Sequence, residues 1–151
     1  MRGLQGKNVL ITGGSSGIGQ AIAMRFAEYG ANVAINYLTT PDEAAGTEEQ
    51  VHTCINKVQQ HGVQDLLVQG DVSKGADVVR MVEETVEGLG SIDVLVNNAG
   101  IQISRPSHEL DNGAFDKVID INLRGSLPAD RQSCLSARRY PPTFHSCQLK
   151  V

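Results

Sequence analysis

The sequence predicts an α/β fold in which helices cover both faces of a doubly wound parallel sheet. Three observations lead to this prediction. Short apolar runs alternate along the chain with segments of helical periodicity, which is the pattern of βαβ units. The apolar runs are nearly continuous, as expected for strands buried on both faces. A glycine-rich turn, TGGSSGIG at residues 12–19, joins the first run to the first helix.

The first half of the pattern predicts two strands and two helices. The run NVLIT at residues 8–12 is the first strand, and ANVAINY at residues 31–37 is the second. The helix between them carries apolar residues at helical spacing, namely Ile18, Ile22, Phe26 and Tyr29, and Gly30 is placed to end it. A capping box of Thr40, Pro41 and Glu43 predicts the start of the second helix, whose inner face is Val51, Cys54, Ile55 and Val58.

The next segments repeat the alternation. DLLVQGDV at residues 65–72 is the third strand, and Ser73 is placed to cap a helix with the inner face Val78, Val82, Val86 and Leu89. IDVLVNNAG at residues 92–100 is the fourth strand, and the spacing of Phe115, Val118, Ile119 and Leu123 predicts a fourth helix. Right-handed crossovers then give the strand order 3-2-1-4.

The alternation ends after Gly125, where three prolines interrupt a segment without helical or alternating periodicity. Residues 126–151 hold four basic residues and one acidic residue, whereas the whole chain has a net charge of −4. We therefore predict one domain at residues 1–125 and a disordered, unrelated tail at residues 126–151, which leaves the fourth strand as an open edge. A shifted reading frame or an altered splice would explain the change.

Composition excludes several classes of function. The negative net charge argues against binding of nucleic acid, which requires a basic surface. No apolar run approaches the roughly 20 residues of a membrane-spanning helix, and the N-terminus lacks the apolar core of a signal peptide. Three cysteines form no disulfide framework, and Cys134, His145 and Cys147 match no zinc pattern. We therefore expect a cytoplasmic protein without a metal or a membrane partner.

The glycine turn predicts a site for a phosphate group. Gly13 permits the tight turn, Gly17 lets the backbone approach a pyrophosphate, and Gly19 allows close packing of helix on strand. The free N–H groups and the dipole at the start of the helix attract the phosphates. Gln20 follows the last glycine where a P-loop requires lysine. The turn therefore predicts a Rossmann-type dinucleotide site, with a tight turn that binds nothing as the alternative.

Residues 7–125 resemble the N-terminal half of a short-chain dehydrogenase/reductase. Four motifs carry the resemblance: TGGSSGIG at 12–19, GDV at 70–72, NNAG at 97–100, and Asn122 within DINLRG. The run NNAGIQIS is most similar to the bacterial glucose 1-dehydrogenase branch. The resemblance implies an oxidoreductase that uses NAD or NADP.

The resemblance also implies roles for individual residues. Asp71 would accept a hydrogen bond from the adenine amino group, and Thr12 would bond to the segment Asn97 to Gly100, which closes the cofactor cleft. Asn122 belongs to the family's catalytic tetrad, in which a kinked helix exposes a carbonyl to a proton-relay water. Without the resemblance, Asp71 is an acid at a helix start and Asn122 is a helix interior residue. The expected cofactor-binding residues are Thr12, Gly13, Ser15, Gly17, Ile18, Gly19, Asn36, Asp71, Val72, Asn98, Ala99 and Gly100.

The choice between NAD and NADP depends on charge at the end of the second strand. An acid there would bind the ribose hydroxyls, and an arginine would accept a 2′-phosphate. This chain has Asn36, Tyr37 and Leu38, so neither preference is strongly encoded. Because no acid repels a 2′-phosphate, the sequence leans toward tolerance of NADP.

The tail lacks the family's remaining catalytic residues. Hydride transfer uses a tyrosine as acid and base, a lysine four residues later that lowers its pKa, and a serine that polarises the carbonyl. Tyr140 is followed four residues later by Phe144, and two prolines between them exclude a shared helix. Leu127 stands where the serine is expected. We therefore expect a truncated oxidoreductase that is inactive alone and has lost the family's homo-oligomer interface. The alternative is a cofactor-binding module or partner subunit without catalysis.

Overall fold

The computed structural model describes residues 3–39, 44–139 and 145–148. The strands are β1 (Asn8–Ile11), β2 (Asn32–Tyr37), β3 (Asp65–Gln69), β4 (Val94–Asn97) and β5 (His145–Gln148). The helices are α1 (Gly17–Glu28), α2 (Ala44–Gln59), α3 (Gly75–Leu89), α4 (Asn112–Ile119) and α5 (Ser126–Arg139), with a 3-10 turn at Ser107–Glu109 and a π-helical segment at Asp120–Arg124. The strands form one parallel sheet in the order β3-β2-β1-β4-β5. The expected order of the first four strands is confirmed.

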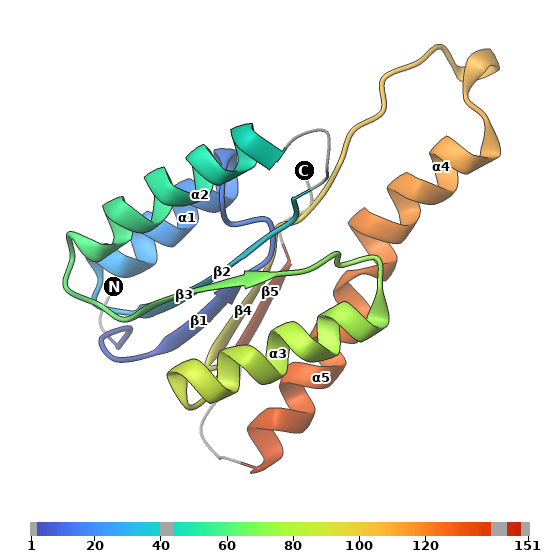
Figure 1. Ribbon diagram of the computed structural model, residues 1–151. Helices are drawn as coiled ribbons and strands as arrows, with labels where there is room; N and C mark the ends of the chain where they lie inside the picture. The colour runs from blue at the N-terminus through green and yellow to red at the C-terminus, as the bar shows by residue number, and fades with distance from the viewer. Residues whose placement is uncertain (1–2, 40–43, 140–144, 149–151) are drawn as a thin grey trace.

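Helices cover both faces of the sheet (Figure 1). Helices α1 and α2 pack on the face formed by Val9, Ile11, Val33 and Ile35. Helices α3 and α5 lie on the opposite face, where Leu10, Ala34 and Leu95 contribute to a second core. Successive strand residues thus enter different cores, which explains why the strands are apolar without alternation.

The order of connections places a cleft at one edge of the sheet. From β1 the chain crosses through α1 to β2 on one side, and the strand that follows α3 returns to the other side of β1 as β4. Strand β1 pairs with both neighbours, so that Leu10 aligns with Ala34 and with Leu95. Loops that leave β1 and β4 therefore diverge at their carboxyl ends, which is where open α/β sheets bind ligands.

Beyond Gly125 the structure differs from the sequence-based expectation. Helix α5 continues from the π-helical segment, and β5 pairs in parallel with β4, from Val94 with His145 to Asn97 with Gln148. The expected open edge of β4 and the expected disorder of residues 126–139 and 145–148 are therefore wrong. The division of the chain at Gly125 into two parts of different origin stays a prediction. Tyr140 lies outside the described residues.

Helix α5 was missed because it buries small residues and a hydroxyl group instead of large apolar ones. Ala129 and Ser133, four residues apart on one helical face, are fully buried, and the helix packs against α3 and β4. Pro128 lies in the first turn of α5. A backbone N–H there has no acceptor within the helix, so the missing N–H of proline costs α5 no hydrogen bond. A helix of this kind gives no signal in a search for apolar periodicity.

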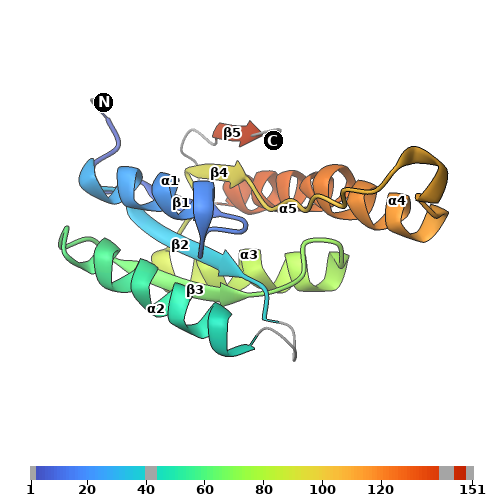
Figure 2. The same cartoon turned by 90° about the horizontal axis from the view of Figure 1, so that it is seen from above.

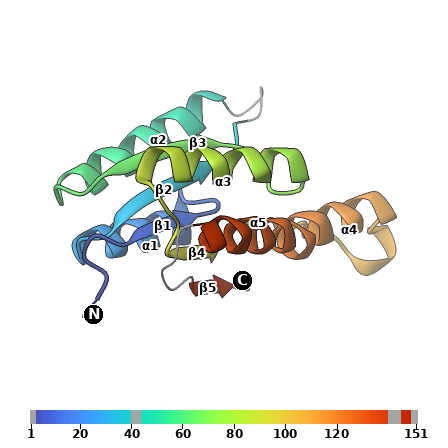
Figure 3. The ribbon, with the colours of Figure 1, turned by 90° about the horizontal axis from the view of Figure 1, so that it is seen from below.

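Helix α4 extends away from the sheet, as the views from above and below show (Figures 2 and 3). Phe115 and Leu123, on and after this helix, are 54% and 49% exposed. No described helix is both long and apolar enough to cross a membrane.

Two predicted helix starts have different outcomes. Helix α3 begins at Gly75 with Lys74 in the cap position, so the prediction that Ser73 caps it is wrong. The hydroxyl of Ser73 instead donates to Asp71. The capping box predicted at Thr40, Pro41 and Glu43 lies outside the described residues.

Candidate functional site

A cleft of about 1020 Å³ opens at the carboxyl ends of β1 to β4. Most of the site residues expected from the sequence line it: Gly13, Ser15, Ile18, Gly19, Asn36, Asp71, Val72, Asn98, Ala99, Gly100 and Asn122. Thr12 and Gly17 are the two expected residues that do not line the cleft. The fold thus brings together segments that are separated by up to about a hundred residues in the sequence.

The turn between β1 and α1 needs glycine for two physical reasons. Gly13 and Gly17 adopt positive φ angles of 62° and 53°, which residues with a Cβ atom rarely adopt. Gly19 has no such angle, but a Cβ atom there would overlap the carbonyl oxygen of Gly13 and lie 2.5 Å from Nδ2 of Asn98. Gly19 therefore allows α1 to start directly against the turn.

The first turn of α1 faces the cleft. The N–H groups at the start of a helix have no partner within the helix. Ser16 occupies the cap position and makes no side-chain capping bond in the described structure. Ile18, in the same turn, is 53% exposed and lines the cleft. The helix dipole and these donors make this end of α1 suited to an anionic group.

Thr12 ties β1 to β4 as expected from the sequence. Its Oγ1 accepts hydrogen bonds from the backbone N–H groups of Asn98 and Ala99, at 3.0 and 3.1 Å. The Asn98 amide in turn donates to the carbonyl oxygens of Thr12 and Gly13, both at 3.0 Å. Thr12 is buried behind the cleft, so its role in this structure is to hold the cleft walls together.

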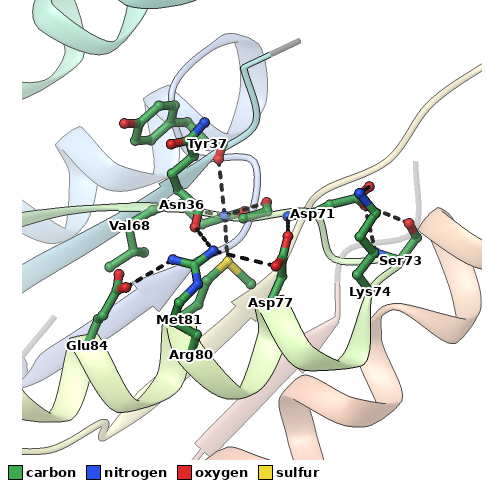
Figure 4. Close-up of polar contacts among 12 residues, drawn as sticks. Asn36, Tyr37, Val68, Asp71, Ser73, Lys74, Asp77, Arg80, Met81 and Glu84 are labelled. Carbon is green, nitrogen blue, oxygen red and sulfur yellow. Dashed lines mark hydrogen bonds and ion pairs between the residues drawn. The ribbon is translucent and has the colours of Figure 1, made fainter.

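The loop after β3 presents Asp71, the one ionisable side chain among the described residues that line the cleft. Its Oδ1 accepts from the N–H and the hydroxyl of Ser73, at 2.9 and 2.7 Å. Its own N–H donates to Oδ2 of Asp77 at 2.9 Å (Figure 4). This hydrogen bond, with further help from Arg80, lowers the pKa of Asp77. The loop is therefore anchored to the first turn of α3.

Asn36 does not behave as a surface contact for a ligand. Its side chain is buried, and the amide is bonded to backbone groups of both the glycine turn and the loop after β3. Leu38 is the exposed residue at this end of β2 and also lines the cleft. The sequence alone placed Asn36 at the strand end without showing that its side chain turns inward.

Asn122 lies in the π-helical segment between α4 and α5. Its Oδ1 accepts from the N–H of Ile101 at 2.8 Å, and its Nδ2 donates to the carbonyl of Ile101 at 2.9 Å. The widened turn is closed by a bond from the N–H of Gly125 to the carbonyl of Asp120 at 2.8 Å. The irregular helix expected at Asn122 is present as this π-helical segment. The two hydrogen bonds between the Asn122 side chain and Ile101 fix the loop after β4.

The other half of the cleft is apolar, and the expected site residues did not include it. Ile101 and Ile103 after β4, and Leu110, Phe115 and Val118 near α4, line this half. The helical spacing of Phe115 and Val118 predicts a helix, but it does not show that these side chains face a cleft. The cleft thus has a polar side at the glycine turn and an apolar side at α4.

Cys54 supports the glycine turn from α2. Its thiol is buried and contacts the carbonyl oxygen of Gly14 at 3.5 Å. Burial raises the pKa of the thiol above its ordinary value, so it stays protonated at neutral pH. A protonated, buried thiol is suited to packing and is a poor nucleophile.

Comparison with known proteins places this arrangement in a family. The sequence model of the short chain dehydrogenase family matches residues 7–134, and so reaches past Gly125. The chain is 40% identical over 119 residues to the 3-oxoacyl-[acyl-carrier-protein] reductase FabG of Staphylococcus epidermidis, covering 79% of this chain and 46% of that protein. It is equally similar to the FabG of Staphylococcus aureus, with the same coverage. The chain spans about half the length of these relatives.

Solved structures show the same likeness. NAD⁺-bound xylitol dehydrogenase matches with a TM-score of 0.85 at 26% identity, over 97% of this chain and 54% of that one. A blue fluorescent protein from a metagenomic library, in complex with NADPH, matches with a TM-score of 0.80 at 32% identity, over 89% and 53%. With the parallel sheet, the glycine turn and the matched motifs, these findings show that the chain belongs to the short chain dehydrogenase family.

Proposed function

We propose that this chain binds a nicotinamide dinucleotide in the cleft and does not carry out hydride transfer by itself. One observation carries the proposal: the glycine turn, the uncapped start of α1 and the carboxylate of Asp71 converge on one cleft. The helix start would hold the pyrophosphate, and Asp71 would accept from the adenine amino group. Two similar solved structures are described as holding NADPH or NAD⁺, which supports this assignment.

The end of β2 supports tolerance of NADP as well as NAD. Asn36 is turned inward, and the exposed residue beside it, Leu38, carries no charge. Neither Asn36 nor Leu38 carries a carboxylate that would repel a 2′-phosphate, and neither is an arginine that would bind one. We therefore expect NADPH to bind with an affinity within about tenfold of that for NADH.

A fluorescence titration tests the proposed binding. The purified chain is titrated with NADPH and separately with NADH, and each titration should saturate at one cofactor per chain. Absence of saturable binding of either cofactor contradicts the proposed function. Binding of NADH more than tenfold tighter than NADPH contradicts only the tolerance of NADP.

The proposed lack of turnover rests on residue chemistry. None of the three tyrosines, Tyr29, Tyr37 and Tyr140, has a lysine four residues later. Of the family's tetrad, the sequence offers Asn122 alone. The chain therefore lacks the tyrosine and lysine pair that exchanges, in this family, the proton that accompanies hydride transfer.

The substrate class of a complete enzyme built on this half is a carbonyl–alcohol pair. The motif NNAGIQIS favours the glucose 1-dehydrogenase branch, and this stays a prediction. The curated relatives named above are 3-oxoacyl-[acyl-carrier-protein] reductases. The cytoplasmic location expected from the sequence stays a prediction too.

A partner subunit without catalysis is a second candidate, favoured by the exposed apolar side chains of Phe115 and Leu123 on and after α4. Sedimentation of the chain mixed with a full-length family enzyme would test it. A mixed complex that Phe115→Ser disrupts supports this role, and independent sedimentation of the two proteins contradicts it.

A further inference from the structure

The inward-facing side chain of Asn36 lies between two parts of the cleft, the glycine turn after β1 and the loop after β3. Asn36 is the penultimate residue of β2 and pairs in register with Val68 of β3. Strand β2 separates β1 from β3 in the sheet. The glycine turn after β1 and the loop after β3 therefore need a bridge across β2 if their relative position is to be fixed.

The amide of Asn36 makes that bridge. Its Oδ1 accepts a hydrogen bond from the N–H of Gly13 at 3.1 Å. Its Nδ2 donates to the carbonyl oxygens of Gly70 and Val68, at 3.0 and 3.2 Å, and also contacts the sulfur of Met81 on α3 at 2.7 Å (Figure 4). One side chain thus contacts the turn after β1, the end of β3 and α3.

The same residue also holds the turn through its backbone. The carbonyl oxygen of Asn36 accepts from the N–H of Gly14 at 2.9 Å. Two consecutive donors of the glycine turn, at Gly13 and Gly14, are therefore bonded to Asn36 rather than directed at the cleft. Because Asn36 is only 2% exposed, solvent cannot replace these bonds if the amide is removed.

We propose that Asn36 is a positioning residue that sets the distance between the phosphate-binding turn and the adenine-binding loop. This inference rests on the proposed function, because it assigns the two parts to one bound dinucleotide. A dinucleotide links adenine to pyrophosphate through a ribose, so both subsites must be correctly spaced for both to be filled. Gly70 directly precedes Asp71, so the bond from Asn36 to the Gly70 carbonyl acts on the residue expected to contact adenine.

The proposal predicts a selective loss of affinity. Replacing Asn36 with leucine, which has a similar size but no donor or acceptor, removes the bridge. Affinity for NADPH should fall at least tenfold, whereas affinities for adenosine and for inorganic pyrophosphate, each of which fills one subsite, should change less than threefold. If Asn36 were needed only for general stability, its replacement would lower the affinities for all three ligands alike or for none of them.

Asn8 provides a matched control at the opposite end of the sheet. It is also buried, and its amide donates to the carbonyl of Leu89 and the hydroxyl of Ser91, at 2.8 and 2.9 Å. Asn8→Leu should destabilise the fold without changing the affinity of the folded chain for NADPH. Asn36→Asp is the second variant of the bridge. It keeps the oxygen that accepts from Gly13 but loses the N–H groups that donate to Gly70 and Val68. The affinity for NADPH should fall as it does in Asn36→Leu.

The experiment measures binding of the three ligands to the unmodified chain and the three variants by calorimetry or by NMR titration. A tenfold or greater loss for NADPH alone in both Asn36 variants, with Asn8→Leu unaffected, supports the proposal. Unchanged NADPH affinity in Asn36→Leu, or an equal loss for all three ligands, overturns the role of Asn36 only. Failure of the unmodified chain to bind NADPH overturns the proposed function and this inference together.

A measurement on the unmodified chain covers the case in which neither Asn36 variant folds. The amide proton of Gly13 should exchange slowly with solvent in the folded chain, because Oδ1 of Asn36 accepts it. Fast exchange at Gly13, alongside slow exchange in the strands, overturns the bridge.

Discussion

At the scale of single residues, Gly17 and Gly19 belong to one turn but are required for different reasons. Gly17 has a positive φ of 53°, and no atom lies within 4 Å of the place where its Cβ would be. A side chain there is strained by the backbone alone, at a cost of about 1 kcal/mol. Gly19 has an ordinary backbone, but its Cβ would overlap the Gly13 carbonyl. The structure thus adds a backbone requirement at Gly17 to the close packing expected at Gly19.

Gly19→Val should abolish binding of NADPH, because the added side chain would push α1 away from the turn that it closes. Gly17→Ala should retain a folded chain with a reduced free energy of unfolding and a lesser loss of affinity. NADPH titration with circular dichroism on the same samples measures both. Equal affinity of Gly19→Val and the unmodified chain would show that the turn is not the phosphate site.

The sequence predicts where several site residues lie in the fold, but it does not predict how every side chain is oriented. Thr12, Asp71 and Asn98 follow strand ends, and the direction of parallel strands places all three at one edge of the sheet. The inward orientation of Asn36 depends on Gly70 and Met81, which come from other elements. No pattern within one strand contains that information, because the contacts form only when the sheet assembles.

At the scale of elements, the start of α3 holds the loop that presents Asp71. Asp77 accepts the Asp71 N–H, which lowers the pKa of Asp77 below its ordinary value of 3.8. A lowered pKa in the folded state means that ionised Asp77 stabilises the fold. This contribution is fully present above pH 3.8 and is lost as the pH falls through the lowered pKa.

Asp77→Asn should therefore be less stable than the unmodified chain near pH 7, and the difference should shrink below pH 3.8. The asparagine imitates the protonated acid, so the two chains converge once Asp77 itself is protonated. Urea unfolding of both chains between pH 7 and pH 3 measures the difference. A difference that stays constant down to pH 3 would mean that the carboxylate charge plays no part.

Helix α5 carries one unfavourable feature that can be removed. The hydroxyl of Ser133 is buried without a hydrogen-bond partner in the described structure, and such a group costs about 1–3 kcal/mol. Ser133→Ala should raise the free energy of unfolding by about 1 kcal/mol. Ser126 is the matched control, since its hydroxyl donates to the carbonyl of Leu123 at 2.8 Å.

Ser126→Ala should lower the free energy of unfolding by about 1 kcal/mol, because it removes a bond that exists. Urea or thermal unfolding of the three chains gives the comparison. Destabilisation by Ser133→Ala would mean that its hydroxyl has a partner and that α5 packs differently from the structure described here.

At the scale of the whole molecule, the alternating pattern was sufficient to predict the parallel sheet and the order of its first four strands. Strands β1 to β4 can be recognised from local sequence, because each is a near-continuous apolar run and the glycine turn follows the first of them. Helix α5 and β5 depend on partners instead: α5 packs small buried residues against α3, and β5 pairs with β4. Such elements have weak local signals, so they could not be predicted from the pattern.

The chain as a whole should bind cofactor and leave it unchanged. Mixing it with NADPH and a 3-oxoacyl thioester, or with NADP⁺ and glucose, should give no change in absorbance at 340 nm above the rate without protein. The reason is that the sequence holds no tyrosine paired with a lysine four residues later. Turnover that disappears in Tyr140→Phe would contradict this expectation directly.

The most direct test of the account is to map NADPH on the folded chain by NMR. Backbone amide signals are compared before and after saturation with NADPH. Shifts should be confined to residues 13–20, 70–72 and 98–101, which lie around the cleft, with little change at the N-terminal ends of the strands near Asn8. Shifts absent from the glycine turn, or centred on another surface, would contradict the assignment of this cleft to a nicotinamide dinucleotide.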